Sequence, residues 1–399
     1  MRTVLVTEAY SARNLGDLEL VERTLSYARS ARASVEVVCL AVDPESFEIP
    51  GVSFFPKLFS RLDLRETRGS KRVQIYLAWA VRWIALSTLA FAPRRVQARS
   101  VRWLVRIGLL PSSAELYTRA SSVIAVGGGY LGDQYFKETL LTVWTWWWAS
   151  RIGVSVETMP VSVEIRSWFL GIIVRLTARN VSWRARDSST VDSLARLGVN
   201  AALVPDLAFA NYCATAAESR VGSVLCLVGA DYLSVVEQRE LESTIVELVK
   251  NSLVPRPVRF LAMHRRIDSS NIGGDLAMSL SIVERLRNEG ISTVSIVDAG
   301  SYADVCNVCD FAEIVLSARM HAGIAALCRG ARVGLLAYEE KHFALMRDME
   351  LERYVIDIRS KPQDYRELTA RLSCSGHLEF HDGAARRFDK LREEGLLGR

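Results

Sequence analysis

Short apolar segments alternate with amphipathic stretches along the chain, and this alternation constrains the fold more than any other feature. Residues 3–7, 34–41 and 122–126 have the composition of buried strands, and residues 18–31 have that of a helix. Strands that alternate with helices are typical of a parallel sheet covered by helices. The sequence therefore predicts an α/β fold.

A second set of strand-like runs begins near residue 223, after the polar, Ala-rich segment 211–221, which we interpret as a linker. A chain of 399 residues is long enough for two domains with separate cores. We predict an N-terminal Rossmann-like domain over residues 1–212 and a C-terminal one over residues 222–399. Two such domains facing across a cleft have the architecture of glycosyltransferase-B-like proteins. The runs of the second set are residues 224–228, 258–263, 293–297, 313–316 and 332–336.

The cysteines and the N-terminus indicate the compartment. Seven cysteines are scattered along the chain, and two of them, Cys39 and Cys226, lie in predicted strands. An odd number of scattered thiols favours a reducing compartment over a disulfide framework. The first residues predict a strand, because the apolar run is too short for a signal peptide and lacks a cleavage site. We expect a cytoplasmic protein.

Basic residues are concentrated in one segment. Residues 71–106 contain eight Lys or Arg and no acidic residue, and within them residues 75–92 are almost wholly apolar or small, interrupted by Arg82. A spanning helix needs about 20 apolar residues, and a central Arg costs about 2.5–3.5 kcal/mol. We predict that residues 71–110 dock on the membrane interface; the alternative is a buried helix followed by an amphipathic one. No recognisable nucleic-acid-binding motif accompanies the arginines, so we expect no nucleic-acid partner.

Three basic residues follow two predicted strands near the C-terminus. The apolar run that ends at Ser317 is followed by Arg319 and His321, and Lys341 follows the next strand. In open α/β sheets, ligands bind at the carboxyl ends of the strands, where helix N-termini expose N–H groups. Arg, His and Lys at this edge predict an anion site that contains a proton-transfer group. The alternatives are a structural salt bridge from Arg319 to Glu313 or Asp310, and a solvated Lys341.

Two further turns carry polar or flexible residues. Asn14, Gly16 and Asp17 lie where the first strand turns into a helix, so Asp17 is either an N-cap or a group that orients or deprotonates an acceptor hydroxyl. Gly127, Gly128 and Gly129 follow a strand, and they can let a ligand approach the backbone or simply form a tight turn. Their spacing matches neither a dinucleotide fingerprint nor a P-loop.

These motifs together resemble one known family. Arg319-x-His321, followed by Tyr338-x-x-Lys341, is similar to the C-terminal signature of the polysaccharide pyruvyl transferases. The turn at residues 14–17 resembles that family's Asn-x-Gly-Asp turn, and the three glycines resemble its glycine triplet. The resemblance therefore spans most of the chain.

The resemblance implies transfer of a pyruvyl group from phosphoenolpyruvate to two hydroxyls of one sugar, which forms a pyruvate ketal and releases phosphate. Phosphoenolpyruvate is then the donor substrate, and neither a cofactor nor a metal is expected. The implied catalytic residues are His321, as the acid that protonates the donor, and Asp17. The implied donor-binding residues are Arg319, Lys341 and Arg166, and the implied acceptor or loop residues are Asn14, Gly16, Gly127, Gly128, Gly129 and Tyr338.

One segment departs from the family pattern. Residues 158–166 keep Pro160 but lack the glycines that the family has there, so the way in which the donor or acceptor lies against this loop is open. We expect the acceptor to be a cell-envelope glycan, lipid-linked on the inner face of the membrane. The alternatives are a glycosyltransferase that uses a sugar nucleotide, and a non-catalytic scaffold of envelope-glycan assembly.

Other conspicuous residues are expected to be structural. Cys306 and Cys309 form a single pair without a second, which is weak evidence for zinc, and we interpret them as core thiols. His342 has no motif around it. The tryptophans at positions 144 and 146–148 are interpreted as core residues on a helix, although such side chains also stack on sugars or lie at membrane boundaries.

Overall fold

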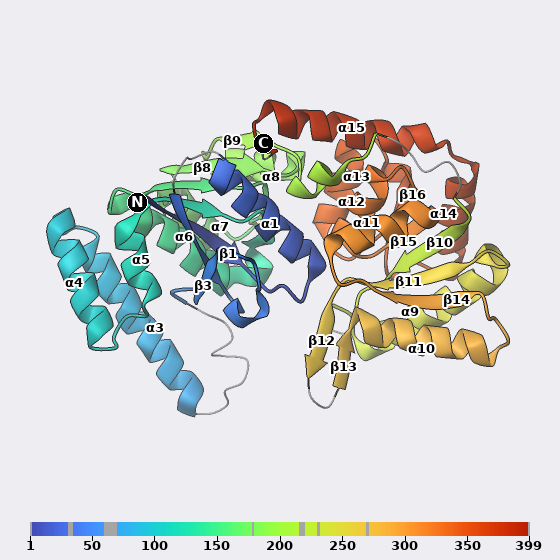
Figure 1. Ribbon diagram of the computed structural model, residues 1–399, viewed down its shortest axis with the longest axis horizontal. Coiled ribbons are helices and arrows are strands. Elements are labelled where there is room, and N and C mark those ends of the chain that lie inside the picture. The colour runs from blue at the N-terminus through green and yellow to red at the C-terminus, as the bar shows by residue number, and fades with distance from the viewer. Residues whose placement is uncertain are drawn as a thin grey trace. The chain divides into compact units, whose positions relative to one another are not determined.

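The computed structural model describes residues 2–30, 35–59, 70–177, 179–214, 220–229, 232–268 and 271–397, without the side chains of residues 70–72 and 265–273. The chain forms two compact units (Figure 1). Unit 1 contains Met1–Ala12, Leu20–Leu207 and Leu396–Arg399, and unit 2 contains Arg13–Glu19 and Ala208–Gly395. Part of the predicted linker, residues 215–219, lies outside the described residues.

Unit 1 is built on a parallel sheet with the strand order β3-β2-β1-β4-β6-β8-β7-β5, and β9 pairs with β8. The central strands are buried apolar runs, as expected for a parallel sheet whose two faces are both covered by helices. The strands are β1 (Arg2–Ala9), β2 (Val35–Ala41), β3 (Ser53–Pro56), β4 (Ala120–Ala125), β5 (Gly128–Gly132), β6 (Ser155–Thr158), β7 (Val161–Glu164), β8 (Val181–Ala185) and β9 (Ala201–Leu203).

The helices of unit 1 include α6, which carries the tryptophan cluster into the core. Trp146 and Trp148 are fully buried, and Trp146 contacts Trp183 of β8 edge to face at 5.5 Å between ring centroids. The prediction that these tryptophans are core residues is confirmed. The helices are α1 (Leu15–Ser30), whose first turn up to Glu19 belongs to unit 2, and α3 (Ser70–Leu89), α4 (Arg94–Arg106), α5 (Ser113–Arg119), α6 (Phe136–Arg151), α7 (Trp168–Thr177) and α8 (Ser188–Arg196).

Unit 2 has a parallel sheet in the order β14-β11-β10-β15-β16-β17, and a separate antiparallel ribbon of β12 and β13. In Figure 1, α9 and α10 lie on one side of this sheet and α11 and α12 on the other. The strands are β10 (Gly222–Cys226), β11 (Val258–Ala262), β12 (Arg265–Asp268), β13 (Asn271–Gly274), β14 (Val294–Asp298), β15 (Ala312–Ser317), β16 (Arg332–Ala337) and β17 (Val355–Asp357).

Side-chain caps define the starts of two helices of unit 2. Ser234 and Glu237 form a reciprocal capping box at the start of α9, and Ser301 and Asp304 form one at the start of α11. The helices are α9 (Val235–Leu248), α10 (Asp275–Asn288), α11 (Tyr302–Phe311), α12 (Met320–Cys328), α13 (Glu340–Asp348), α14 (Pro362–Cys374) and α15 (His377–Glu393). The two parallel sheets confirm the α/β prediction.

Candidate active site

The turn between β15 and α12 places Arg319 and His321 at the carboxyl end of the sheet of unit 2. The Ser317 hydroxyl donates to the carbonyl oxygen of Arg319 at 2.7 Å and accepts from the Arg319 N–H at 3.1 Å. These two contacts close the turn. The Arg319 side chain therefore leaves the sheet edge from a backbone that is fixed on both sides.

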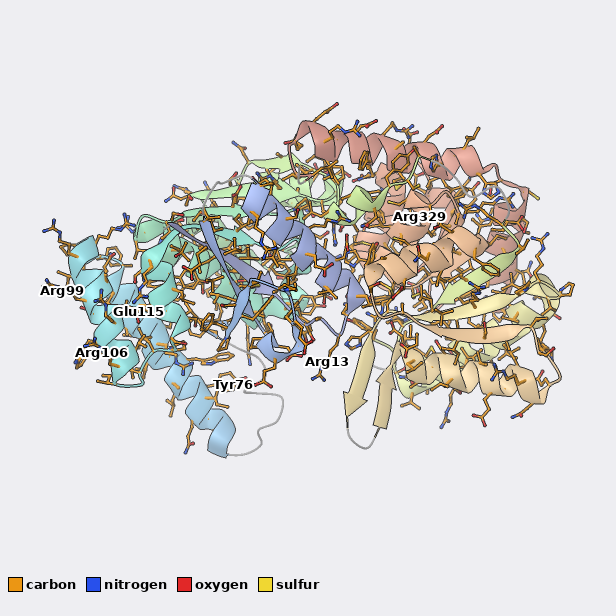
Figure 2. The ribbon with its side chains drawn as sticks, in the orientation of Figure 1. Arg13, Tyr76, Arg99, Arg106, Glu115 and Arg329 are labelled. Carbon is orange, nitrogen blue, oxygen red and sulfur yellow. The ribbon has the colours of Figure 1, made fainter. Side chains whose placement is uncertain are left out.

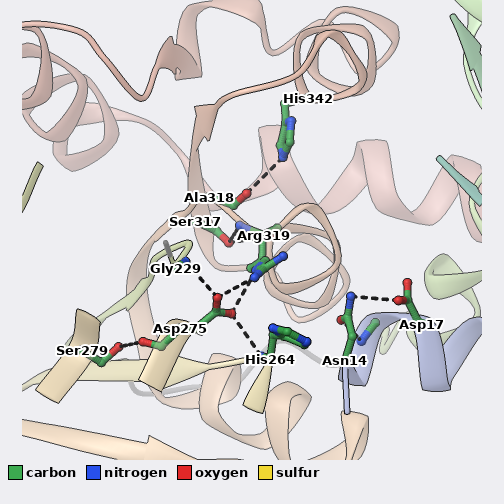
Figure 3. A network of polar contacts seen from close by, with 11 residues as sticks. Asn14, Asp17, Gly229, His264, Asp275, Ser279, Ser317, Ala318, Arg319 and His342 are labelled. Carbon is green, nitrogen blue, oxygen red and sulfur yellow. Dashed lines mark hydrogen bonds and ion pairs between the residues drawn. The ribbon is translucent and has the colours of Figure 1, made fainter. Parts of the chain in front are cut away.

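Arg319 is buried, and Asp275 in the first turn of α10 neutralises it (Figure 3). Its Nε and Nη2 atoms lie 2.9 and 2.5 Å from the two carboxylate oxygens of Asp275. The same carboxylate accepts the backbone N–H groups of Gly229, at 3.2 Å, and His264, at 3.1 Å. Burial acts to lower the pKa of the guanidinium and the Asp275 carboxylate acts to raise it, and the pKa lies above its ordinary value.

The sequence did not identify this partner of Arg319. The salt bridge considered above, to Glu313 or Asp310, does not form. Glu313 instead pairs with Arg256 and Arg332, and Asp310 pairs with Arg329. Asp275 lies 44 residues from Arg319 in the sequence, and it carries no motif by which it could have been recognised.

His321 lies in the first turn of α12, directly against Gly16. A Cβ atom at position 16 would overlap the His321 ring, so glycine is required there by the close approach of the ring. The backbone carbonyl of His321 accepts a hydrogen bond from the hydroxyl of Tyr302 at 2.7 Å. The structure thus brings the N-terminal motif and the C-terminal signature together within unit 2.

The N-terminal motif joins unit 2 through backbone contacts. Asn14 forms an isolated antiparallel bridge with His264, and the Leu15 N–H donates to the Met263 carbonyl at 3.1 Å. The Asn14 side chain accepts from the Gly16 N–H at 3.1 Å and donates to the Asp17 carboxylate at 3.0 Å. Asn14, and not Asp17, makes the capping contact at the start of α1.

Asp17 is half-buried in the first turn of α1, within electrostatic reach of four basic side chains. Burial raises the pKa of its carboxyl above the ordinary value, while His321, Arg319, Lys341 and His264 act to lower it. A carboxyl group in this position is suited to exchanging a proton with a neighbouring hydroxyl or imidazole.

Lys341 lies in the first turn of α13, next to the buried His342 and three residues after Tyr338. It pairs with Glu339 and lies 5.7 Å from the centroid of the Tyr338 ring. His342 is fully buried, and its ring nitrogens lie 3.1 Å from the carbonyl oxygens of Glu339 and Ala318. His342 therefore ties this turn to the turn that carries Arg319, which agrees with its expected structural role.

Tyr232 belongs to the same cluster, although its sequence context carried no signal. Its ring lies 4.8 Å from the Tyr338 ring, and the Arg319 guanidinium lies 5.1 Å from its centroid. Burial raises the pKa of both tyrosine hydroxyls, so they remain protonated donors. The Tyr338 ring also contacts the His342 ring, in a tilted arrangement with 4.7 Å between ring centroids.

The glycine triplet and Arg166 belong to unit 1. Gly128 begins β5 with a φ of 135°, which favours glycine, and its N–H donates to the Pro160 carbonyl at 3.1 Å. A Cβ at Gly127 would lie 2.7 Å from the same carbonyl oxygen. The altered loop therefore packs closely on the glycines. Gly129 continues β5, and Arg166 is exposed and pairs with Glu164 at 2.6 Å.

Two ion pairs determine how the site of unit 2 can bind an anionic ligand. Arg319 and Lys341 each carry a carboxylate partner, so an anionic ligand would share these cations with Asp275 and Glu339. His321 and Asp17 supply two groups able to transfer protons. Among the described residues, no group of three or more His, Cys, Asp or Glu side chains is arranged to hold a metal ion.

Comparisons with solved structures define the class. The UDP-GlcNAc 2-epimerase of Methanocaldococcus jannaschii matches with a TM-score of 0.52 and 8% identity, over 99% of both chains. The sucrose-phosphate synthase of Thermosynechococcus elongatus matches with a TM-score of 0.52 and 9% identity, over 100% of this chain and 96% of that one. At such identities the likeness shows the fold alone, and this protein has the predicted glycosyltransferase-B-like fold.

A family model narrows the class further. The model of the polysaccharide pyruvyl transferases matches residues 14–340, and the chain belongs to that family. The match begins at Asn14 and ends one residue before Lys341, so it contains the N-terminal motif and most of the C-terminal signature. A search of curated proteins gives no match.

Proposed function

We propose that this pyruvyl transferase of polysaccharide biosynthesis uses phosphoenolpyruvate as donor and forms a cyclic pyruvate ketal on one sugar of a cell-envelope glycan. The observation that carries the proposal is the convergence around Asp17. Its carboxyl group interacts electrostatically with basic side chains from three other segments of the chain. These side chains are His264, the pair Arg319 and His321, and Lys341. Phosphoenolpyruvate carries a phosphate and a carboxylate, which such cations bind through charge-assisted hydrogen bonds.

In the proposed reaction, His321 donates a proton to the methylene carbon of phosphoenolpyruvate, which makes the adjacent carbon electrophilic. A sugar hydroxyl adds to that carbon and gives its proton to Asp17 or back to His321. A second hydroxyl of the same sugar then displaces phosphate, which leaves with the second proton. Arg319 and Lys341 stabilise the negative charge on the departing phosphate.

The acceptor in this proposal is a lipid-linked glycan precursor at the inner face of the membrane, and the protein works in the cytoplasm at that surface. Arg166, from the loop that departs from the family pattern, is the third proposed donor-binding cation, although Glu164 shares its charge. The proposed reaction needs no nucleic acid and no cofactor besides the donor substrate.

The test is the melting temperature of the purified protein with phosphoenolpyruvate, with UDP-sugars and with inorganic phosphate. A ligand that binds only the folded state raises the melting temperature. We expect phosphoenolpyruvate to raise it and Lys341→Ala to abolish the rise. Lys250→Ala is the matched control, because Lys250 also pairs with a glutamate of unit 2.

The other outcomes decide against this donor. A rise with a UDP-sugar alone would favour a glycosyltransferase, the activity that the similarity to sugar-nucleotide enzymes suggests. If no ligand raises the melting temperature and a His321→Asn variant keeps its activity in envelope-glycan assembly, the protein would instead be a non-catalytic scaffold of that assembly.

A further inference from the structure

Helix α3 leaves one apolar face uncovered. Its other face carries Trp79 and Leu86, which are buried in the core of unit 1. At the edge of that face, the ring of the partly exposed Trp83 lies 5.9 Å from the ring of Trp144 of α6. Val73, Leu77, Val81 and Ile84 are exposed, and their spacing of three or four residues places them on one side of the helix. The alternative, a buried helix followed by an amphipathic one, holds only in part: α3 is buried along one side, and α4 is amphipathic, with Val101 buried. No helix in the described residues is long and apolar enough to cross a membrane.

Helix α4 combines exposed aromatic and basic side chains. Trp103 is 60% exposed, and Arg99 and Arg106 lie four residues before it and three after it, on the same side of the helix. Figure 2 shows both arginines pointing outward from α4. Arg95 is also exposed. No acidic residue occurs between residues 70 and 114, and Glu115 of the neighbouring α5 pairs with Arg102. The exposed side of α4 therefore carries an excess of positive charge.

Helix α7 is a second uncovered apolar element, which the sequence analysis did not associate with membranes. Trp168 and Leu176, at its two ends, are 76% and 61% exposed, and Phe169 and Ile172 between them are also exposed. Its buried side chains, such as Leu170, face the core of unit 1.

The start of α6 joins α7 to α3. The Lys137 ammonium group donates to the Tyr76 hydroxyl of α3 at 3.1 Å. The neighbouring Phe136 stacks on Phe169 of α7 at 6.2 Å between ring centroids. The start of α6 therefore contacts both α3 and α7, which makes the two helices neighbours around it in unit 1.

We propose that the exposed faces of α3, α4 and α7 form one docking surface for an anionic lipid bilayer. The apolar side chains enter the interface, the tryptophans lie at its boundary, and the arginines meet anionic headgroups. This inference rests on the proposed function: if the acceptor is lipid-linked, docking on the bilayer holds the enzyme where that substrate lies. A symmetric dimer through the same surface is disfavoured, since it would bring the arginines of two copies together.

The proposal is tested by sedimentation of the full chain with vesicles of phosphatidylcholine alone or with phosphatidylglycerol added. We expect binding to the anionic vesicles that weakens as salt is raised. Each basic residue near such a surface contributes about 1 kcal/mol, or about fivefold in partitioning. Arg95→Ala, Arg99→Ala and Arg106→Ala combined should therefore lower binding by roughly a hundredfold and flatten its salt dependence.

The double variant Trp168→Gln, Leu176→Gln tests α7 separately. It should lower binding at least tenfold while the salt dependence stays, because the exposed apolar area is lost and the charges are kept. Matched controls remove exposed side chains of unit 2: Lys361, Arg366 and Arg371 to Ala for charge, and Val236 and Leu378 to Gln for apolar area. Neither control should change binding.

Three outcomes would overturn the proposal: no binding to anionic vesicles, equal binding to both vesicle types, or full binding by the Trp168/Leu176 variant. A dimer in sedimentation velocity that this variant dissociates would assign the surface to a second copy instead. Vesicle binding is measured without phosphoenolpyruvate, so its failure is distinguishable from failure of the proposed reaction.

Discussion

Asp275 and Arg319 form a buried pair in which the carboxylate of the first turn of α10 accepts two N–H groups of the guanidinium, at 2.9 and 2.5 Å. Asp275 is fully buried and also accepts two backbone N–H groups, so its position is fixed by four contacts. A guanidinium has five N–H groups, and Asp275 engages two of them. Asp275 therefore positions Arg319 before any anion binds.

Asp275→Ala should destabilise the protein strongly. It leaves the buried Arg319 charge without its partner, and breaking a buried ion pair in this way costs about 3–5 kcal/mol. The measurement is the free energy of unfolding in urea. Asp310→Ala is the control, because its pair with Arg329 is partly exposed and such pairs are worth at most about 1 kcal/mol. Equal effects of the two variants would contradict a structural role specific to Asp275.

Gly16→Ala should disturb the site through sterics alone. The new methyl group would overlap the His321 ring, and overpacking of this kind costs about 1–3 kcal/mol. We expect lower stability and a smaller rise in melting temperature with phosphoenolpyruvate. Gly376→Ala is the control, since a Cβ there has no atom within 4 Å, and it should cost less than about 1 kcal/mol. An unchanged ligand response in Gly16→Ala would show that the position of His321 does not matter for donor binding.

Asp17→Asn should abolish turnover while it stabilises the fold at neutral pH. Burial raises the pKa of Asp17 above its ordinary value of 3.8, so the folded state holds this proton more tightly than the unfolded chain. The associated stability is complete below pH 3.8 and is lost as the pH rises through the folded pKa. Asparagine mimics the protonated group and avoids that loss. The melting temperature of the variant at pH 7 should therefore exceed that of the unsubstituted protein.

The check for Asp17→Asn is a series of melting temperatures between pH 4 and pH 8. The advantage of the variant should shrink toward pH 4, and the exposed Asp382→Asn control should show no such trend. If Asp17→Asn instead lowers the melting temperature equally across the range, the carboxylate serves the fold as an ion-pair partner and the proton-transfer role is wrong.

Tyr232→Leu should weaken donor binding, and Tyr232→Phe should preserve most of it. The ring lies beside the Arg319 guanidinium, and a cation–π contact of this kind contributes about 0.5–1 kcal/mol. Isothermal titration with phosphoenolpyruvate should give about a threefold weaker affinity for the leucine variant. If phenylalanine weakens binding as much as leucine, the hydroxyl, and not the ring, is the functional group.

Much of the fold followed from local patterns. The apolar runs at residues 224–228 and 313–316 correspond to β10 and β15, because a strand buried on both faces must be continuously apolar. Strands such as β5 and β7 were not predicted. They are short, and β5 begins with two glycines, which are rare in strands, so tertiary pairing overrides local preference there.

The sequence by itself determined the class of fold and pointed to Arg319, His321, Lys341 and Asp17, because their motifs are local and follow predicted strands. Only the tertiary structure decided their surroundings. The Asp275 carboxylate, the Tyr232 ring and the contact of Gly16 with His321 all join segments far apart in the chain. Side-chain packing and ion pairing depend on the three-dimensional approach of such segments, which periodicity along the chain does not encode.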